Sequence, residues 1–494
     1  MQEPPTTTEG LLQRTARGAG WVMAWRWGMR VLGLTSTLVL VRLIAPADFG
    51  IIALANSFMQ TIDGMLALGT EEAVIRERSP TREFYDTAFT MNLLRGVSVT
   101  LLVAALAWPA ARFFDDPRLG PVLLFVAAVP LLDSVANIGA VDFRRDFAFH
   151  KEFTIMVLPK LCGIIAALAA AFAFRSYVAM LFGMGVNRSL RVVMSYVMHP
   201  YRPRLSLRAW EGLAGYSFWT WLLSLAVLVR DRADSLVLGR LMNLSAVGIY
   251  SVGSEIAALP MTELIEPLGR AAFSGFAAAR TQALNAGETW LRLIGSAALL
   301  TLPAGVGLSL VAAPLVALAF GPGWQEAVPV LRILSMAFTI MVFGHLSEHL
   351  LSVHALLGRL VGMTLLGATV RIALLAALIP PFGLTGAALA AAGGVVLDQT
   401  LRVISTMRHF RVTTRQLLGH VARPLCAACA MAGALVWLDL GWTDDTSVAT
   451  LAEAVVLGGV VYAATLAAAW AAAGAPLGAE RDLLGAVWPK ARVT

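Results

Sequence analysis

Fourteen long apolar runs dominate this sequence and limit what it can fold into. A bilayer core about 30 Å thick is crossed by roughly 20 apolar residues in a helix, and each run meets or nearly meets that length. With 58% hydrophobic and 14% charged residues, the chain has more apolar surface than a soluble core can bury. We therefore expect an all-α polytopic membrane protein with about 14 transmembrane helices. The runs cover approximately residues 20–43, 50–70, 87–108, 119–140, 153–174, 177–198, 216–238, 244–265, 289–319, 327–351, 358–379, 384–406, 423–439 and 448–473.

The basic residues lie between the runs and favour one set of alternate connections. The set that contains both termini holds 21 Lys and Arg residues, and the opposite set holds five. Because cytoplasmic loops carry the excess of basic residues, we expect both termini in the cytoplasm of a cell with a bacterial inner membrane. A net charge of +7 then fits loops beside anionic lipid, and we expect no nucleic-acid partner.

The sequence offers little for a metal or a cofactor. Cys426 and Cys429 form a C-x-x-C inside the short apolar run of residues 423–439, where small residues usually pack. His345, Glu348 and His349 match the inverted zinc-peptidase pattern H-x-x-E-H, but no further Glu occurs before residue 453. We expect neither a metal nor a cofactor. The first 19 residues lack the features of a signal peptide, so we expect the first helix to act as an uncleaved anchor.

An internal repeat gives the domain organisation. Residues 37–51 align without gaps with residues 235–249, and the identical positions include Arg42 with Arg240 and Gly50 with Gly248. Helices 1 and 2 thus correspond to helices 7 and 8, and an even repeat of six helices gives two parallel lobes about a central cleft. We expect a cytoplasmic tail (1–19), an N-lobe (20–200), a C-lobe (201–410), two extra helices (411–473) and a cytoplasmic tail (474–494).

The junction of the first two helices resembles a known family. It reads Arg-Leu-x-x-Pro-x-Asp-Phe-Gly from Arg42 to Gly50, and a related junction follows Arg240 and Leu241 in the second lobe. Leu68-Gly69 and the stretch from Ala73 to Arg76 extend the match. On these motifs the chain resembles bacterial polysaccharide flippases, a branch of the multidrug and oligosaccharidyl-lipid exporter superfamily. Glu71 and Glu72 depart from the family pattern, where small or uncharged residues are commoner.

The resemblance implies a function as well as a fold. It implies twelve helices in two MATE-like lobes plus two further helices, alternating access, and a polyprenyl-diphosphate-linked glycan as cargo, with a polysaccharide polymerase or export machinery as partner. A cation-coupled multidrug exporter of the same fold is the alternative, for which an acidic or aromatic cleft is expected. A membrane glycan polymerase or glycosyltransferase is a third reading, but no predicted external connection exceeds about a dozen residues. We expect no enzymatic activity.

Basic residues inside the runs are the candidates for cargo binding. Such residues cost roughly 2.5–3.5 kcal/mol each on insertion scales and usually face a polar cavity or a partner. A guanidinium can donate two hydrogen bonds to a pair of phosphate oxygens. As alternatives, Arg26 could reach the headgroups, and Arg230 could pair with Asp234 at i, i+4. The candidates are Arg26, Arg30, Lys160, Arg188, Arg230, Arg232 and Arg371.

Acidic residues inside the runs are the candidates for coupling transport to H⁺ or Na⁺. A carboxylate in a low dielectric takes up a proton readily, but it serves equally well as a counter-ion to an arginine. Lys160 and Arg371 occupy corresponding helices of the two lobes and could instead form buried pairs with Asp133 or Asp398. The coupling candidates are Asp63, Asp133, Asp231, Asp234 and Glu255.

Overall fold

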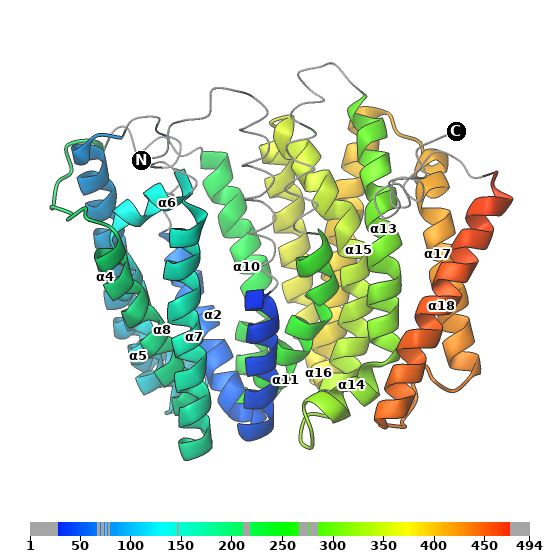
Figure 1. Cartoon of the computed structure of the whole chain (residues 1–494), viewed down its shortest axis with the longest axis horizontal. Coiled ribbons are helices and arrows are strands. Elements are labelled where there is room, and N and C mark those ends of the chain that lie inside the picture. The colour runs from blue at the N-terminus through cyan, green and yellow to red at the C-terminus, as the bar shows by residue number, and fades with distance from the viewer. Residues whose placement is uncertain are drawn as a thin grey trace. The chain divides into compact units, whose positions relative to one another are not determined.

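The computed structural model describes residues 28–66, 70, 74, 77, 80–145, 148–210, 218–265, 276 and 285–474. These residues are almost entirely helical and contain no strand (Figure 1), which confirms the all-α prediction. The chain forms two compact units, Met1–Ser217 and Phe218–Thr494. Several predicted features lie outside the described residues: Arg26, nearly all of both predicted tails, and the motif from Leu68 to Arg76, of which only two isolated residues are described.

Unit 1 is built mainly of long helices. Pro46 at the start of α2 and Asp48 two residues further on favour a helix start. Thr81 caps α4 by accepting a hydrogen bond from the Phe84 amide. The helices are residues 28–43, α2 (Pro46–Met65), α4 (Arg82–Phe113), α5 (Leu119–Ser134), the 3₁₀ turn η1 (Ile138–Val141), α6 (Asp142–Arg145), α7 (Phe149–Phe174) and α8 (Tyr177–Met198).

Glycines bring α7 and α8 into close contact. A Cβ on Gly163 would lie 2.8 Å from the Gly183 carbonyl oxygen, and a Cβ on Gly183 would lie 2.7 Å from the Gly163 carbonyl oxygen. Small residues at such crossings are how membrane helices approach one another in lipid, where no hydrophobic effect drives them together. The pair α7 and α8 therefore depends on these two positions having no side chain.

Unit 2 contains the longest helix and the two extra helices at the end of the chain. The predicted run 289–319 is divided, since α13 ends at Leu310 and α14 begins at Ala312. The elements are α10 (Phe218–Leu241), α11 (Leu244–Ala257), the π-helical turn η2 (Met261–Ile265), α13 (Ala286–Leu310), α14 (Ala312–Ala319), α15 (Ala327–Val353), α16 (Leu357–Phe410), α17 (Thr414–Trp437) and α18 (Val448–Ala472).

The helix α16 is two membrane segments joined at a sharp turn. A straight helix of its 54 residues would be about 81 Å long, far more than the bilayer core. Gly383, directly after Pro380, Pro381 and Phe382, has φ +56° and breaks the helix, a conformation that glycine adopts at little cost. The two predicted runs 358–379 and 384–406 are thus the two halves of α16.

Seven helices among the described residues are long and apolar enough to cross a membrane, and α16 counts once among them. The apolar helices α5 and α11 are shorter. The count of fourteen stays a prediction. The two extra helices pack on α13: Met431 of α17 and Tyr462 of α18 share a buried cluster with Leu302, and the Tyr462 hydroxyl donates to the Leu299 carbonyl at 2.9 Å.

Hydrogen bonds hold residues 199–210, which follow α8, against α4. The Asp86 carboxylate accepts hydrogen bonds from the Tyr201 hydroxyl and the Arg204 amide, and the Ser206 amide donates to Thr90 at 2.9 Å. Burial and the hydrogen bond to Asp86 raise the pKa of Tyr201. Residues 199–210 therefore belong structurally with unit 1, which extends to Ser217, whereas the predicted N-lobe ended at residue 200.

Candidate functional site

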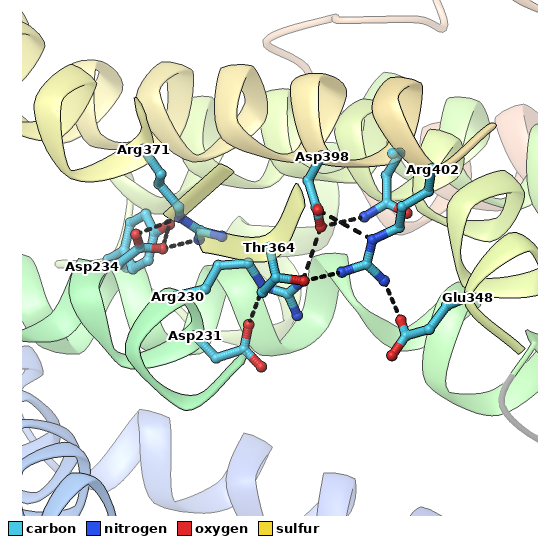
Figure 2. A network of polar contacts seen from close by, with 10 residues as sticks. Arg230, Asp231, Asp234, Glu348, Thr364, Arg371, Asp398 and Arg402 are labelled. Carbon is cyan, nitrogen blue, oxygen red and sulfur yellow. Dashed lines mark hydrogen bonds and ion pairs between the residues drawn. The ribbon is translucent and has the colours of Figure 1, made fainter. Parts of the chain in front are cut away.

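A chain of alternating charges runs through unit 2 and connects α10, α15 and α16 (Figure 2). At its centre is Asp398, whose carboxylate contacts Arg230 at 2.9 Å and Arg402 at 3.1 Å. Arg230 also binds Asp231 at 2.9 Å, and Arg402 also binds Glu348. We call these five residues the Asp398 network.

The centre of the network is buried and its ends are more exposed. The side chains of Asp398 and Arg402 are 1% and 2% exposed, whereas those of Glu348 and Asp231 are 26% and 48% exposed. Arg402 also donates to the Thr364 hydroxyl at 3.0 Å. Charges in a low-dielectric interior are stable only when paired and hydrogen-bonded, and each buried member of this network has at least two charged partners.

A second cluster in unit 2 joins Asp234 of α10 to Arg371 of α16 (Figure 2). The Arg371 guanidinium forms a bidentate ion pair with the Asp234 carboxylate, with Nε donating to Oδ1 at 2.8 Å and Nη2 donating to Oδ2. The Tyr250 hydroxyl of α11 donates to the same carboxylate. Bidentate pairs of this kind fix the orientation of both side chains, so this cluster connects the three helices α10, α11 and α16.

The fold of α16 makes both clusters possible. A Cβ on Gly394 would lie 2.8 Å from the Arg371 Cβ, and one on Gly367 would lie 3.1 Å from the Asp398 Cβ. The two halves of α16 thus pack closely against each other, and glycines leave the space in which the charged side chains begin.

Unit 1 carries two partly exposed ion pairs. Asp63 of α2 binds Arg95 of α4, and Asp133 of α5 binds Arg188 of α8 at 2.9 Å. The carboxylates are 32% and 34% exposed. Arg95 also borders a cavity of about 660 Å³ whose other walls are largely apolar.

The structure also brings Lys160 beside the first helix. Its Nζ lies 3.8 Å from the position of a Cβ on Gly33, which is three residues after Arg30 and therefore on the same side of that helix. Both basic side chains are half-buried. Arg232 is half-buried on α10, and Glu255 is exposed on α11.

Several predicted positions are thus paired, but not with the predicted partners. The alternative in which Arg230 pairs with Asp234 is wrong, since Arg230 binds Asp231 and Asp398 while Asp234 binds Arg371. For the same reason Arg371 does not pair with Asp398, and the partner of Asp133 is Arg188.

Five members of these clusters were not predicted as site residues, namely Arg95, Tyr250, Glu348, Asp398 and Arg402. Asp398 was considered only as a possible counter-ion of Lys160 or Arg371. Arg402 and Arg95 lie in apolar runs, and Arg402 follows Asp398 at i, i+4, a spacing that could have revealed the pair. Glu348 was considered only within H-x-x-E-H. In the structure the Nε2 atoms of His345 and His349 lie 3.3 Å apart, and the described residues hold no group of three His, Cys, Asp or Glu side chains suited to a metal.

Comparison with known proteins places this fold. A family model described as "Polysaccharide biosynthesis protein" matches residues 39–329, more than half of the chain. The chain belongs to this family. The predicted resemblance to polysaccharide flippases is thereby confirmed.

Curated relatives agree with the polysaccharide biosynthesis family. The lipopolysaccharide biosynthesis protein WzxC of Escherichia coli (strain K12) is 22% identical over 339 residues, 68% of this chain and 69% of that protein. The succinoglycan biosynthesis transport protein ExoT of Rhizobium meliloti (strain 1021) is 24% identical over 330 residues, 66% of each chain. The chain thus aligns with about two thirds of each relative.

Solved structures show the same fold. The lipid II flippase MurJ in an inward closed conformation superposes with a TM-score of 0.73 at 13% identity, over 91% of this chain and 98% of that one. An inward-facing multidrug resistance MATE family transporter gives 0.61 at 15% identity, over 77% and 94%. At this identity the likeness concerns the fold, which is that of a multi-span membrane transporter.

Proposed function

We propose that this chain is a flippase that moves a lipid-linked oligosaccharide across the bacterial inner membrane by alternating access. Its family and the names of its relatives, a lipopolysaccharide biosynthesis protein and a succinoglycan biosynthesis transport protein, support the cargo class. The observation that carries the proposal is the presence of two partly exposed ion pairs, Asp63 with Arg95 and Asp133 with Arg188, on otherwise apolar helices. Charges inside membrane helices face water or a partner, as a path for a polar headgroup requires.

In this proposal the basic residues of each unit bind the diphosphate of the cargo. Arg30 and Lys160 serve in unit 1. In unit 2, Arg230 exchanges the exposed carboxylate of Asp231 for a phosphate, because phosphate and carboxylate accept the same pattern of guanidinium hydrogen bonds. Asp398 stays in place and keeps the guanidinium oriented. Of the remaining basic candidates, Arg188 and Arg371 support this set from their ion pairs with Asp133 and Asp234, and Arg26 and Arg232 stay candidates for direct contact with the cargo.

Deleting the gene in its source organism tests the proposal. We expect loss of one envelope or extracellular polysaccharide and accumulation of its lipid-linked repeat unit, because assembly stops when the unit cannot cross the membrane. The same deletion should leave the polymerase or export machinery expressed. Normal polysaccharide with no accumulated intermediate would contradict the proposal.

A cation-coupled multidrug exporter is the second candidate, and one observation favours it. The Asp398 network holds three carboxylates against two guanidiniums, so it could attract a cation. Under this alternative, expression in a drug-sensitive host raises resistance to cationic drugs, and Asp398→Asn abolishes that gain. Under the flippase proposal, resistance is unchanged by the wild-type chain.

The topology is tested by labelling single cysteines in a chain whose three native cysteines have been replaced. Arg415 is exposed near the start of α17, within the densest basic cluster, and we expect it on the cytoplasmic side. A membrane-impermeant maleimide added to intact cells should not label Arg415→Cys, but it should label Asp444→Cys in the next connection. External labelling of Arg415→Cys would reverse the proposed orientation.

Coupling to protons is tested at Asp63. This carboxylate is 32% exposed, and its partner Arg95 borders a cavity, so protonation there can break the ion pair and change the local packing. We expect Asp63→Asn to remove the pH dependence of transport while the protein still folds and inserts. Asp133→Asn is the comparison variant, since its ion pair is similarly exposed; loss of the pH dependence in Asp133→Asn alone would assign coupling to Asp133. Unchanged pH dependence in Asp63→Asn would assign the residue to structure.

A further inference from the structure

Unit 2 also contains a groove that lies apart from the charged clusters of Figure 2. This groove of about 630 Å³ runs along α15, with walls from the end of α13, the second half of α16 and the connection between α17 and α18. Its residues include Ser309, Arg332, Met336, Ile340, Val396 and Trp442. We call it the Arg332 groove.

The Arg332 groove is apolar along most of its length and polar at one end. Met336, Ile340 and Val396 are 38%, 38% and 42% exposed, so an apolar molecule in the surrounding membrane can reach them. Arg332 lies five residues after the start of α15, about 7 Å along the helix from its end. Ile340 is about 12 Å deeper. The headgroup of a lipid would contact the end of the groove at Arg332, and its hydrocarbon chain would contact the deeper part at Ile340.

Within the described part of the chain, Arg332 has no ion-pair partner, and its Nε is buried without a hydrogen bond. By contrast, Arg95, Arg188, Arg230, Arg371 and Arg402 each bind a carboxylate. Ser309 contacts the backbone of Arg332, donating from its hydroxyl to the carbonyl at 3.0 Å, and among the described residues no hydrogen bond joins this hydroxyl to the guanidinium. A cation in a membrane helix without a counter-ion is costly, and an external anion would remove that cost.

The polar end is also held in a defined shape. The Trp442 amide donates to the Leu310 carbonyl at 2.8 Å, and the indole nitrogen lies 3.5 Å from the Ser309 hydroxyl. Tryptophan is typical of the level of lipid headgroups, where one part of its ring is in contact with hydrocarbon and the other with water.

We propose that the Arg332 groove binds an anionic phospholipid of the surrounding bilayer. The Arg332 guanidinium binds the phosphate, and one acyl chain lies along Met336, Ile340 and Val396. A free anion would leave the apolar walls unused, and an uncharged lipid would leave Arg332 without a counter-ion. This site shares no residue with the proposed cargo path, so it holds a resident lipid that joins α13, α15 and α16.

Native mass spectrometry of the purified full-length protein, titrated with phosphatidylglycerol, tests the site. Losing a hydrogen bond to a charged group corresponds to roughly tenfold or more in affinity, so we expect that loss for Arg332→Ala and a smaller one for Arg332→Lys. Ala392→Phe should weaken binding with Arg332 intact, because Ala392 lines the groove. Arg112→Ala removes an exposed arginine in the last turn of α4 and should bind as wild type does.

Competition identifies the occupant. We expect undecaprenyl phosphate to displace phosphatidylglycerol only at higher concentration, and inorganic phosphate not to displace it. Tighter binding of undecaprenyl phosphate would assign the groove to the carrier lipid of the cargo and overturn the proposal, as would displacement by inorganic phosphate. Wild-type affinity in Ala392→Phe and in whichever Arg332 variants fold would also overturn it.

Discussion

Replacing Arg402 by methionine is expected to destabilise the protein by about 3–5 kcal/mol, the cost of breaking a buried ion pair from one side. Arg402 is 2% exposed and bridges Asp398 and Glu348, so its loss leaves two carboxylates without this shared cation. Methionine has a similar length and is apolar, so the change tests charge rather than volume. Unfolding of the purified protein in detergent would be followed by heat and by denaturant.

The matched control for this prediction is Arg359→Met. Arg359 is exposed near the start of the same helix, α16, and a surface change of this kind usually alters stability by less than about 0.5 kcal/mol. If both variants unfold alike, the Asp398 network contributes nothing measurable to stability. Asp398 and Glu348 would then be neutral in the folded protein.

Replacing Arg30 or Arg230 by alanine is expected to weaken cargo binding by roughly one to two orders of magnitude. Each guanidinium is proposed to donate to the diphosphate, and a hydrogen bond to a charged group contributes about 1.5–3 kcal/mol. Lysine should restore only part of the loss, because it keeps the charge without the planar fork. Arg230→Ala leaves Asp398 its contact with Arg402, so the fold should survive the change. Transport in proteoliposomes and abundance in the membrane would be measured together.

The outcome separates recognition from structure. Arg112→Ala serves as the control, since it removes an exposed arginine of unit 1. Wild-type transport by both alanine variants at normal abundance would exclude recognition of the cargo by these two residues. A collapse of abundance would instead make them structural partners of nearby groups.

The sequence predicted helices well but not how they connect. Apolar runs of the right length mark membrane segments, because lipid imposes one thickness on all of them. The same signal cannot show that α13 stops at Leu310 or that α16 continues through Pro380 and Pro381 to a turn at Gly383. Those features depend on single backbone conformations inside stretches of uniform hydrophobicity.

The sequence likewise marked many of the charged positions and missed their pairing. Arg230 and Asp234 are the obvious pair at i, i+4, yet Asp234 binds Arg371, 137 residues away. Helical spacing shows which side chains share a face, but the choice among partners depends on which helices pack together. Gly394 helps to place Arg371, since its missing side chain leaves room for Arg371 against the second half of α16.

Flipping of a labelled lipid-linked oligosaccharide by the purified protein in liposomes tests the central claim most directly. The label is placed in both leaflets, and a membrane-impermeant enzyme or reagent removes the exposed glycan from outside. The account predicts that liposomes with the wild-type chain lose nearly all of the label, whereas empty liposomes and those with the Arg30→Ala, Arg230→Ala double variant lose about half. Wild-type liposomes that also retain half of the label, under every ion gradient supplied, would contradict it.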